Sequence, residues 1–432
     1  MSWRSHFEQN TATAREAVKA VKPGDRVVLA HACGEPRSLV SAMMERAPDL
    51  TGVEIVHMVS MGKALYCLPE HCHSFRHNSL FAGASSRQAI NEGRADYTPC
   101  HFSEIPLLFR YDRLPVDVAL ITATPPDKQG FVGLGISVDY TRQAALSAKT
   151  TIALVNPNAP RVAGDCCLHV SDIDRFVPSD EPLIELSPPK IGDVERAIGS
   201  NVASIIKDGD CLQLGIGAIP DATLSFLKEK NDLGIHSEMV SDGVMHLVEE
   251  GIVNCRKKTL HPNKIVITFA MGTREFYQWM DHNSMIEMYP VDYTNDPYVI
   301  AKNDNLVSIN SAISVDLLGQ VAADTLGPRQ FSGTGGQVDF VRGARRSRGG
   351  RSIIALPATA AKRKASRIVS VLEKGQAVTT SRQDVDYVVT EYGVAPLRGK
   401  TVRDRAEGLI RIAAPEFRDR LREEYKEVYL AR

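Results

Sequence analysis

Short apolar runs recur along the chain, and they are the first indication of its architecture. The runs DVALIT (117–122), TIALV (151–155), KIVITF (264–269) and SIIAL (352–356) are rich in β-branched residues and are apolar on both faces of a strand. Such strands are typical of a parallel sheet that helices cover on both sides. Residues 403–430 are instead rich in Arg, Glu and Leu and predict one or two amphipathic helices.

Two segments repeat the same order of features. KPGDRVVLAHACGEPRSLVSAM (22–43) and KDGDCLQLGIGAIPDATLSFL (207–227) both begin with Lys-x-Gly-Asp, run through a short apolar strand and pass a small-residue turn. Each then enters an apolar-periodic helix after a proline, and a helical pattern precedes each segment. A helix–turn–strand–loop–helix unit that occurs twice predicts two related open α/β domains with largely parallel sheets. Two such units can also look alike by chance.

The boundary between these domains is visible in the sequence. Residues 176–191, FVPSDEPLIELSPPKI, hold four prolines and little periodicity, which is typical of a linker. We therefore expect an N-terminal domain over residues 1–185 and a C-terminal domain over residues 190–432. Each repeat places a loop at the carboxyl end of its sheet, so we expect the active site between the domains.

Charge and composition exclude several classes of partner. The chain has 51 basic and 52 acidic residues and a net charge of −1, so no chain-wide field favours nucleic acid or an anionic membrane. Its N-terminus, MSWRSHFEQNTATAREAV, lacks the apolar core of roughly 7–15 residues of a signal peptide. Eight scattered cysteines in such a chain are most simply reduced thiols. We expect a cytoplasmic protein without a nucleic-acid or membrane partner.

Two cysteine-containing segments could suggest metal or redox chemistry. The segment CLPEHCHSFRH contains Cys67, His71, Cys72, His73 and His77. Zinc sites usually pair C-x₂-C with a second knuckle, which is missing here, so a polar loop is favoured and no metal site is predicted. The pair Cys166-Cys167 is interpreted as buried small hydrophobic residues rather than as a redox site.

A glycine loop, Leu214–Pro220, joins a predicted strand to a predicted helix. Its glycines allow a ligand to approach the backbone, and the free amides at the start of a helix attract anions. The third glycine of G-x-G-x-x-G is replaced by Pro220, so the loop is no dinucleotide fingerprint. A simple tight turn remains the alternative.

A second glycine-rich segment, FSGTGGQVDF, covers residues 331–340. Three glycines in four positions, flanked by hydroxyl groups, are a plausible cradle for an oxyanion or a phosphate. Basic residues follow it, namely Arg342, Arg345, Arg346, Arg348, Arg351, Lys362, Arg363 and Lys364. This local excess of positive charge indicates a phosphorylated small ligand, and a solvated basic loop is the alternative.

Glu238 is the candidate for a reactive carboxylate. Residues 234–251 predict a strand that ends at Ser237-Glu238, followed by a helix that is capped at its start by Ser241 or Asp242. Open α/β sheets bind ligands at the carboxyl ends of their strands. Desolvation there would make the carboxylate a better nucleophile. By position alone, Glu238 is one candidate among several acids.

Several motifs together resemble one enzyme family. They are CGEP (33–36), PPDKQGFVGLGISVD (125–139), GIGAIP (215–220), HSEMVSDGV (236–244), SGTGGQVDFVRG (332–343) and TEYGVAPLRGK (390–400). They resemble the acetyl-CoA hydrolase/transferase family, and within it the branch of 4-hydroxybutyrate and butyrate–acetate CoA-transferases. The resemblance extends over nearly the whole chain.

The resemblance implies a ping-pong exchange of CoA between carboxylic acids. In such enzymes a glutamate, here matched by Glu238, attacks the acyl-CoA thioester and forms an acyl-glutamyl anhydride. The released CoA thiolate then forms a glutamyl-CoA thioester, and a second acid reverses the steps. This chemistry requires no metal and no permanently bound cofactor, because CoA is a substrate. The implied partners are acyl-CoA, small carboxylic acids and further copies of the chain in a dimer or tetramer.

Further residues match family positions. The predicted CoA-binding residues are Gly215, Ile216, Gly217, Ala218, Ile219, Ser332, Gly335, Gly336 and Lys362. Ser332 stands where relatives often have asparagine, and Lys-Arg-Lys from Lys362 replaces the usual Lys-Gly-Gly. Glu391 resembles a second active-site carboxylate, with an acid that caps a turn as the alternative.

Three functions remain open at this stage. CoA transfer between short acids is the first, acyl-CoA hydrolysis on the same fold is the second, and a non-catalytic nucleotide-binding protein is the third. We expect residues 33–36 and 60–62 to face the acyl group. Butyrate, 4-hydroxybutyrate, itaconate and succinate all remain candidate acids, with acetate as the expected partner.

Overall fold

The computed structural model describes residues 2–430 and divides the chain into two compact units. Unit 1 holds the residues up to Ser187 together with Val266–Thr294, and unit 2 holds Pro188–Ile265 and the residues from Asn295 onward. The chain therefore passes between the units three times. The first passage falls in the proline-rich segment, and residues 266–294 return to unit 1.

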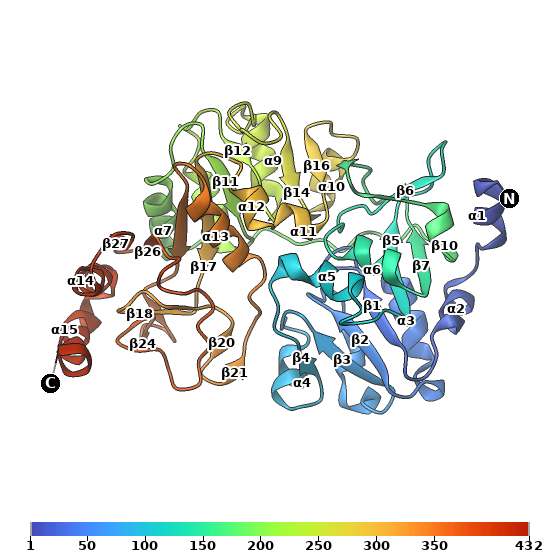
Figure 1. Cartoon of the computed structure of the whole chain (residues 1–432), viewed down its shortest axis with the longest axis horizontal. Coiled ribbons are helices and arrows are strands. Elements are labelled where there is room, and N and C mark those ends of the chain that lie inside the picture. The colour runs from blue at the N-terminus through green and yellow to red at the C-terminus, as the bar shows by residue number, and fades with distance from the viewer. Residues whose placement is uncertain (1, 431–432) are drawn as a thin grey trace. The chain divides into compact units, whose positions relative to one another are not determined.

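Unit 1 is built on a seven-stranded sheet whose strands all run parallel (Figure 1). The order of its strands is β10-β7-β5-β1-β2-β3-β4. Their bounds are β1 Arg26–Leu29, β2 Val53–His57, β3 Phe75–Ser79, β4 Asp96–Tyr97, β5 Val118–Ala123, β7 Thr150–Val155 and β10 Arg175–Pro178. Every residue of β5 is buried, as expected for a strand that is apolar on both faces.

Helices and short strands complete unit 1. The α-helices are α1 Trp3–Gln9, α2 Ala14–Ala17, α3 Arg37–Glu45, α4 Arg87–Asn91, α5 Ile105–Arg110, α6 Thr141–Ser147, α10 Arg274–Met280 and α11 Val291–Thr294. The 3-10 helices are η1 Val18–Ala20, η2 Ala47–Asp49, η3 Leu65–Cys67, η4 Pro69–His71, η5 Phe102–Glu104 and η6 Val170–Asp172. The short strands are β6 Phe131–Gly133, β8 Ala163–Gly164, β9 Cys167–His169, β14 Ile265–Ile267, β15 Phe269–Ala270 and β16 Ile286–Met288.

Unit 2 has a six-stranded sheet in the order β12-β11-β17-β22-β26-β27. The first five strands are parallel to their neighbours, and β27 is antiparallel to β26. Their bounds are β11 Cys211–Leu214, β12 Gly234–Ile235, β17 Leu306–Ser311, β22 Arg351–Ala355, β26 Tyr387–Thr390 and β27 Gly393–Pro396. The carboxyl ends of the five parallel strands thus share one edge of the sheet.

The remaining elements of unit 2 connect these strands or pack on them. The helices are α7 Asp193–Ala203, α8 Ala218–Ser225, α9 Asp242–Glu249, α12 Pro297–Ile300, α13 Gln337–Arg346, α14 Val402–Ile412, α15 Pro415–Tyr425 and the π-helix η7 Lys426–Leu430. The short strands are β13 Met239–Val240, β18 Ser314–Asp316, β19 Val321–Ala322, β20 Thr325–Leu326, β21 Arg329–Gln330, β23 Thr359–Ala360, β24 Ala365–Ser366 and β25 Ile368–Val369.

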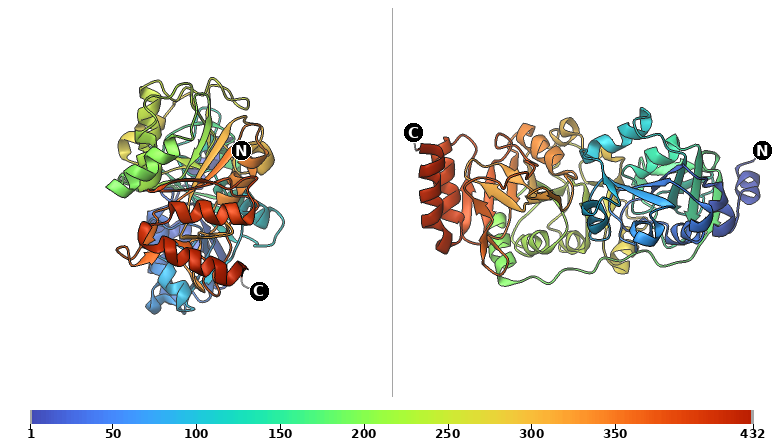
Figure 2. Two further views of the ribbon diagram at one scale, coloured as in Figure 1. Left: turned by 90° about the vertical axis from the view of Figure 1, so that its left-hand side faces the viewer. Right: turned by 90° about the horizontal axis from the view of Figure 1, so that it is seen from below.

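The predicted α/β class with largely parallel sheets is confirmed. The four predicted strands appear as β5, β7, β22 and the pair β14 and β15. The repeated order of helix, strand and helix appears as α2–β1–α3 in unit 1 and as α7–β11–α8 in unit 2. The predicted C-terminal helices are α14 and α15, which lie side by side (Figure 2).

Two boundaries differ from the predicted ones. Strand β10 takes up residues 175–178, so the irregular part of the linker begins at Ser179. Strand β12 ends at Ile235, so Glu238 lies in the connection between β12 and β13 rather than at the end of a strand. None of the helices in residues 2–430 combines the length and the apolar character that a membrane span requires.

Candidate active site

The carboxyl edge of the sheet in unit 2 carries most of the predicted site residues. Glu238 follows β12, the loop of residues 215–219 follows β11, and Glu391 follows β26. Parallel strands bring these connections to one edge, where α/β sheets bind their ligands. Neighbouring strands lie about 4.8 Å apart, so the ends of β12 and β26 are about 19 Å apart. Glu238 and Glu391 therefore belong to opposite ends of this edge.

Glu238 is held in place through the residue before it. The Ser237 hydroxyl donates to the Leu214 carbonyl oxygen at 3.0 Å and accepts from the Leu214 amide at 3.3 Å. Ser237 is fully buried, whereas Glu238 is half-buried. Helix α9 then starts at Asp242, as predicted. The catalytic candidate is thus fixed to the end of β11, beside the glycine loop.

Asn295 is a site residue that the sequence reasoning missed. Its Nδ2 atom donates a hydrogen bond to Glu238 Oε2 at 2.9 Å. The side chain of Asn295 is fully buried, and its Oδ1 atom has no hydrogen-bond partner among the described residues. A buried amide that donates to a carboxylate restricts that carboxylate to one orientation. No spacing in the sequence joins these two residues, which are 57 positions apart.

Gly336 completes the contact around the Glu238 carboxylate. A Cβ atom at position 336 would overlap Glu238 Oε2 and Asn295 Nδ2. The φ of Gly336 is −91°, an ordinary value, so glycine is required here for space and not for conformation. Gly335, with φ of +54°, is required for conformation. Gly336 directly precedes α13, so the positive end of this helix lies beside the carboxylate.

The glycine loop after β11 leaves its backbone open to the approach of a ligand. Gly217 has φ of +119° and precedes α8, whose first residue is Ala218. A Cβ atom on Gly215 or Gly217 would meet no atom within 4 Å, so the space above the loop is open. Ile216 is 43% exposed, and Ile219 is buried. The loop therefore presents backbone to solvent next to a helix start, as an anion-binding loop does.

Ser332 has a local structural contact. Its hydroxyl donates to the Ala323 carbonyl oxygen at 2.8 Å, and its amide donates to the Asp324 carbonyl oxygen at 3.0 Å. These bonds hold the loop that leads to Gly335 and Gly336. The side chain of Ser332 thus shapes the glycine segment.

The arginines that follow this segment are engaged with groups of unit 2. The pairs are Arg342 with Asp384 at 3.5 Å, Arg345 with Asp386 at 3.5 Å, Arg348 with Asp304, and Arg351 with Asp210. Arg346 lies over the Tyr298 ring, 5.2 Å from its centroid. Arg346 ends α13, about 15 Å along the helix from Gly336 at about 1.5 Å per residue. Each of these arginines thus has a partner within unit 2, and Arg348 stays largely exposed.

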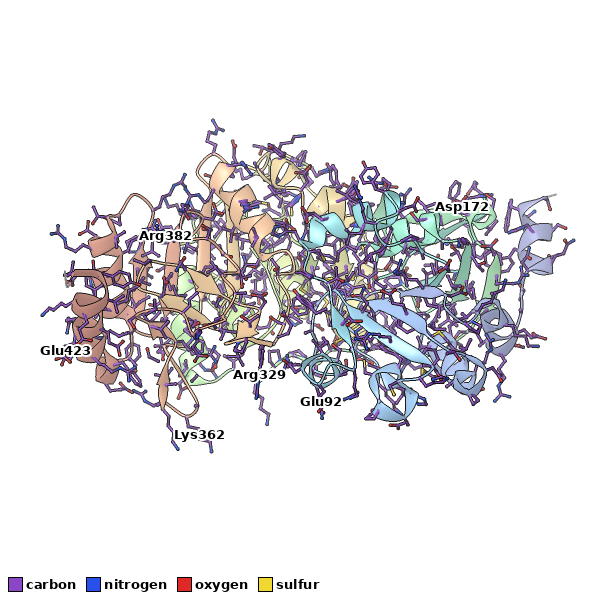
Figure 3. All side chains as sticks on the ribbon, turned by 60° about the horizontal axis from the view of Figure 1, so that its bottom comes forward. Glu92, Asp172, Arg329, Lys362, Arg382 and Glu423 are labelled. Atoms are coloured by element: carbon purple, nitrogen blue, oxygen red, sulfur yellow. The ribbon has the colours of Figure 1, made fainter. Side chains whose placement is uncertain are left out.

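Lys362 lies at the tip of the hairpin formed by β23 and β24, with its side chain extended outward (Figure 3). Ala361, Lys362 and Arg363 have φ of +50°, +56° and +68°. These left-handed values favour glycine, so the non-glycine residues at the tip are conformationally costly. Arg363 donates to Glu416 Oε1 at 2.7 Å and to the Tyr392 hydroxyl at 3.2 Å. These two bonds connect the hairpin tip to Glu416 and Tyr392.

Glu391 lies in the turn between β26 and β27. Its Oε2 atom accepts a hydrogen bond from the Ala358 amide at 2.8 Å, which ties the turn to the chain after β22. Burial lowers the pKa of the Arg367 guanidinium, and the negative charge of Glu391 opposes that shift. Both interpretations of Glu391, a second active-site carboxylate and an acid that caps a turn, accord with these contacts.

In unit 1, the loops after β1 and β2 are joined by Glu35. Its Oε2 atom accepts from the Ser60 hydroxyl at 3.1 Å and from the Gly62 amide at 3.0 Å. Burial raises the pKa of the Glu35 carboxyl, and these two donors oppose the rise. Glu35, Met61 and Gly62 also line a cavity of about 830 Å³. The two segments predicted to face the acyl group are therefore neighbours in unit 1.

The cysteine–histidine segment is spread over several elements. Cys67 ends η3, His71 ends η4, and His77 lies in β3, where its Nδ1 atom is 3.0 Å from the Ile55 carbonyl oxygen. Cys72 is exposed. Within residues 2–430, no group of three or more His, Cys, Asp or Glu side chains is placed to hold a metal ion.

Comparisons with known proteins show the family of this chain. Acetyl-CoA hydrolase/transferase N-terminal and C-terminal domains match residues 1–187 and 272–425. The chain is 58% identical over 426 residues to 4-hydroxybutyrate coenzyme A transferase of Clostridium kluyveri, which covers 99% of both chains. It is 36% identical over 431 residues to butyryl-CoA:acetate CoA-transferase of Anaerostipes caccae, covering 98% of this chain and 97% of the other.

A solved structure is also similar over the whole chain. The 4-hydroxybutyrate CoA-transferase of Porphyromonas gingivalis superposes with a TM-score of 0.86 at 43% identity, covering 99% of this chain and 100% of the other. With the relatives above, this likeness defines an enzyme of the CoA-transferase type. The chain belongs to the acetyl-CoA hydrolase/transferase family.

Proposed function

We propose that this enzyme moves CoA between short-chain carboxylic acids by a ping-pong reaction through a glutamyl-CoA thioester at Glu238. The observation that carries the proposal is the contact of Glu238, Asn295 and Gly336 at the carboxyl edge of a parallel sheet. One carboxylate oxygen accepts a hydrogen bond from a buried amide, which fixes the orientation of the whole group. A carboxylate held in this way is suited to nucleophilic catalysis.

The proposed steps balance without an external reagent. A Glu238 oxygen attacks the thioester carbonyl, the C–S bond breaks, and CoA leaves as a thiolate. The thiolate then attacks the glutamyl carbonyl of the anhydride, and the first acid leaves as a carboxylate. Oε2 gains negative charge in the tetrahedral intermediate of this step, and Asn295 Nδ2 donates to that oxygen. A second acid reverses both steps.

The proposal includes the substrate class. The relatives named above act on 4-hydroxybutyrate and on butyryl-CoA with acetate, so we infer acids of this size, with acetate as the partner. The exchange changes no oxidation state, so it involves no hydride carrier, and CoA enters only as a substrate. Predicted CoA contacts are the loop of residues 215–219, the amides at Gly335 and Gly336, and Lys362.

The test is detection of the covalent intermediate. The enzyme is incubated with butyryl-CoA without an acceptor acid, and the digested protein is analysed by mass spectrometry. We expect the mass of CoA, less one water, on the peptide that contains Glu238. Borohydride should reduce this thioester and inactivate the enzyme irreversibly, whereas borohydride without butyryl-CoA should leave the activity unchanged.

Two variants serve as controls for this experiment. Glu238→Gln keeps the shape of the side chain but removes the nucleophile, so it should lose the adduct and nearly all transfer. Glu238→Asp withdraws the carboxylate by one methylene and should favour attack by water over transfer. An adduct on Glu391 or on a cysteine would overturn the assignment. Release of free CoA at the same rate with and without an acceptor acid would instead identify a hydrolase.

A further inference from the structure

Cys166 and Cys167 form a close pair of thiols in unit 1. Cys167 begins β9, and Cys166 directly precedes it. Their Sγ atoms are 3.9 Å apart, and the Cys166 Sγ atom is 3.3 Å from the Val162 carbonyl oxygen. Neighbouring side chains in a regular strand point to opposite faces, so this proximity requires the bend that precedes β9. The two thiols are within reach of each other.

The two thiols differ in their access to solvent. Cys166 is fully buried, and Cys167 is partly exposed. In the antiparallel ladder of β6 and β9, the residue opposite Cys167 is Gly133, which has no side chain. The cross-strand neighbour that would normally cover a strand residue is therefore missing at Cys167. Cys167 is therefore the more accessible of the two residues.

The two thiols also differ in acidity. A hydrogen bond from the Cys166 thiol, and then the Arg161 charge, lower the pKa of Cys167 against the opposing effects of burial, Asp127 and Asp165. The same hydrogen bond and burial raise the pKa of Cys166. Arg161 and Arg142 face the two acids, at 3.8 Å from Asp127 and 3.1 Å from Asp165 respectively. Cys167 therefore has the properties of a reactive thiolate, and Cys166 those of its proton donor.

We propose that Cys166 and Cys167 are a modification site, a vicinal dithiol that hydroperoxides oxidise to a disulfide. The Cys167 thiolate attacks the peroxide, the O–O bond breaks, and a sulfenic acid forms at Cys167 with release of water or an alcohol. Cys166 then attacks the sulfenyl sulfur, its proton passes to the leaving hydroxyl, and a second water departs. Two thiols lose two electrons and one peroxide is reduced. This replaces the interpretation of the pair as buried hydrophobic residues.

The second step requires only a local movement. A disulfide has a sulfur–sulfur distance of about 2 Å, so the two sulfurs must approach by about 2 Å from their present separation. Rotation of the partly exposed Cys167 side chain toward Cys166 supplies part of this movement. A twist of the peptide between the two residues supplies the rest, because consecutive Cα atoms, about 3.8 Å apart, lie closer than the roughly 4.4–6.8 Å usual for disulfides. No other cysteine has to approach the pair.

The test maps oxidation on the full-length reduced protein. One equivalent of hydrogen peroxide is added, free thiols are blocked with N-ethylmaleimide, and the tryptic peptide of residues 162–175 is analysed without reductant. We expect this peptide to lose two hydrogen atoms, to resist the maleimide and to regain both thiols with dithiothreitol. Its oxidation should be roughly fivefold faster than that of the exposed Cys72, because the hydrogen bond from Cys166 and the Arg161 charge stabilise the Cys167 thiolate.

Two substitutions separate the roles of the sulfurs. In Cys166→Ser the sulfenic acid at Cys167 cannot be resolved, so dimedone should label Cys167 there but not in the unmodified protein. In Cys167→Ser the buried Cys166 should stay reduced. The proposal is overturned if Cys72 oxidises while the 162–175 peptide stays reduced. Equal dimedone labelling of Cys167 with and without Cys166, or a disulfide from either residue to another cysteine, would also overturn it.

Discussion

The space beside the Glu238 carboxylate admits only glycine at position 336. Gly336→Ala should leave the backbone unstrained, because its φ of −91° suits alanine. The added methyl group would displace Glu238 Oε2 and Asn295 Nδ2, and a displacement of about 1 Å in such a site costs about 100-fold in rate. We therefore expect kcat/KM to fall by about this factor in steady-state assays, with a smaller effect on thermal unfolding.

Gly83→Ala is the matched control for this substitution. A Cβ atom at Gly83 would meet no atom within 4 Å, and the residue lies outside the candidate site. Its activity and Tm should equal those of the unmodified protein. If Gly336→Ala retained full transfer activity, the proposed geometry at Glu238 would be wrong.

Lys362 presents a charge at an exposed hairpin tip, which suits contact with the phosphates of CoA rather than with the reacting carbon. Binding energy from a remote part of the substrate can be used in the transition state. Lys362→Ala should therefore reduce kcat/KM for a CoA ester several-fold and leave that for the pantetheine thioester unchanged. Lys364→Ala, on the same tip, is the control. Equal losses with both thioesters would reject a phosphate role for Lys362.

At the scale of elements, helices α8 and α9 bring two carboxylates together. Burial, and then the charge of Asp242, raise the pKa of Asp221 in α8 from 3.8 to about 6. Between pH 3.8 and about pH 6, Asp221 is protonated in the folded protein but ionised in the unfolded chain. The free energy of unfolding therefore falls as pH rises through this window. Above about pH 6, Asp221 is ionised in both states, and its ionisation lowers the free energy of unfolding no further.

Asp221→Asn removes this titration. Because Asp221 is only partly buried, we expect a gain of about 1–2 kcal/mol in the free energy of unfolding at pH 7.5, and little gain near pH 4.5. Urea denaturation at pH 4.5, 6.0 and 7.5 measures this difference. Asp49→Asn, the same substitution at an exposed position, provides the control. A gain of equal size at all three pH values would contradict the titration argument.

At the scale of the whole molecule, unit 1 is not a continuous stretch of chain. Residues 266–294 supply Phe269, whose ring centroid is 4.6 Å from that of His31 and 6.0 Å from that of Phe102. The Thr268 carbonyl oxygen accepts from the Val138 amide at 3.1 Å. The apolar core of this unit therefore depends on a segment far away in the sequence.

A fragment of residues 1–187 should not reach the native state by itself. Without residues 266–294 it exposes apolar rings and unpaired amides, so we expect dye binding, weak near-ultraviolet circular dichroism and no cooperative unfolding. The same fragment joined to residues 266–294 by a glycine–serine linker should unfold cooperatively. Cooperative unfolding of residues 1–187 alone would show that this segment is dispensable.

The sequence alone determined the features that are encoded locally. Runs such as 117–122 and 151–155 predict strands correctly because an apolar strand needs no distant residue to reveal its pattern. The order of helix, strand and helix appeared twice for the same reason. The motifs that carry the family resemblance, the one around Glu238 included, are contiguous strings, so the family could be identified from them together. The predicted end of the strand before Glu238 was less accurate, because the contact of Ser237 with Leu214 joins residues from two different strand ends.

Tertiary structure alone decided which distant residues meet. Asn295 reaches Glu238 across 57 positions, and no periodicity or spacing encodes that contact. The sequence shows a run of basic residues after the glycine segment, and only the fold shows that Arg351 pairs with Asp210 and Arg348 with Asp304. Residues 266–294 join unit 1 because their apolar strands complete its core. Such choices depend on which surfaces pack together, and packing acts between segments that a linear pattern cannot bring into contact.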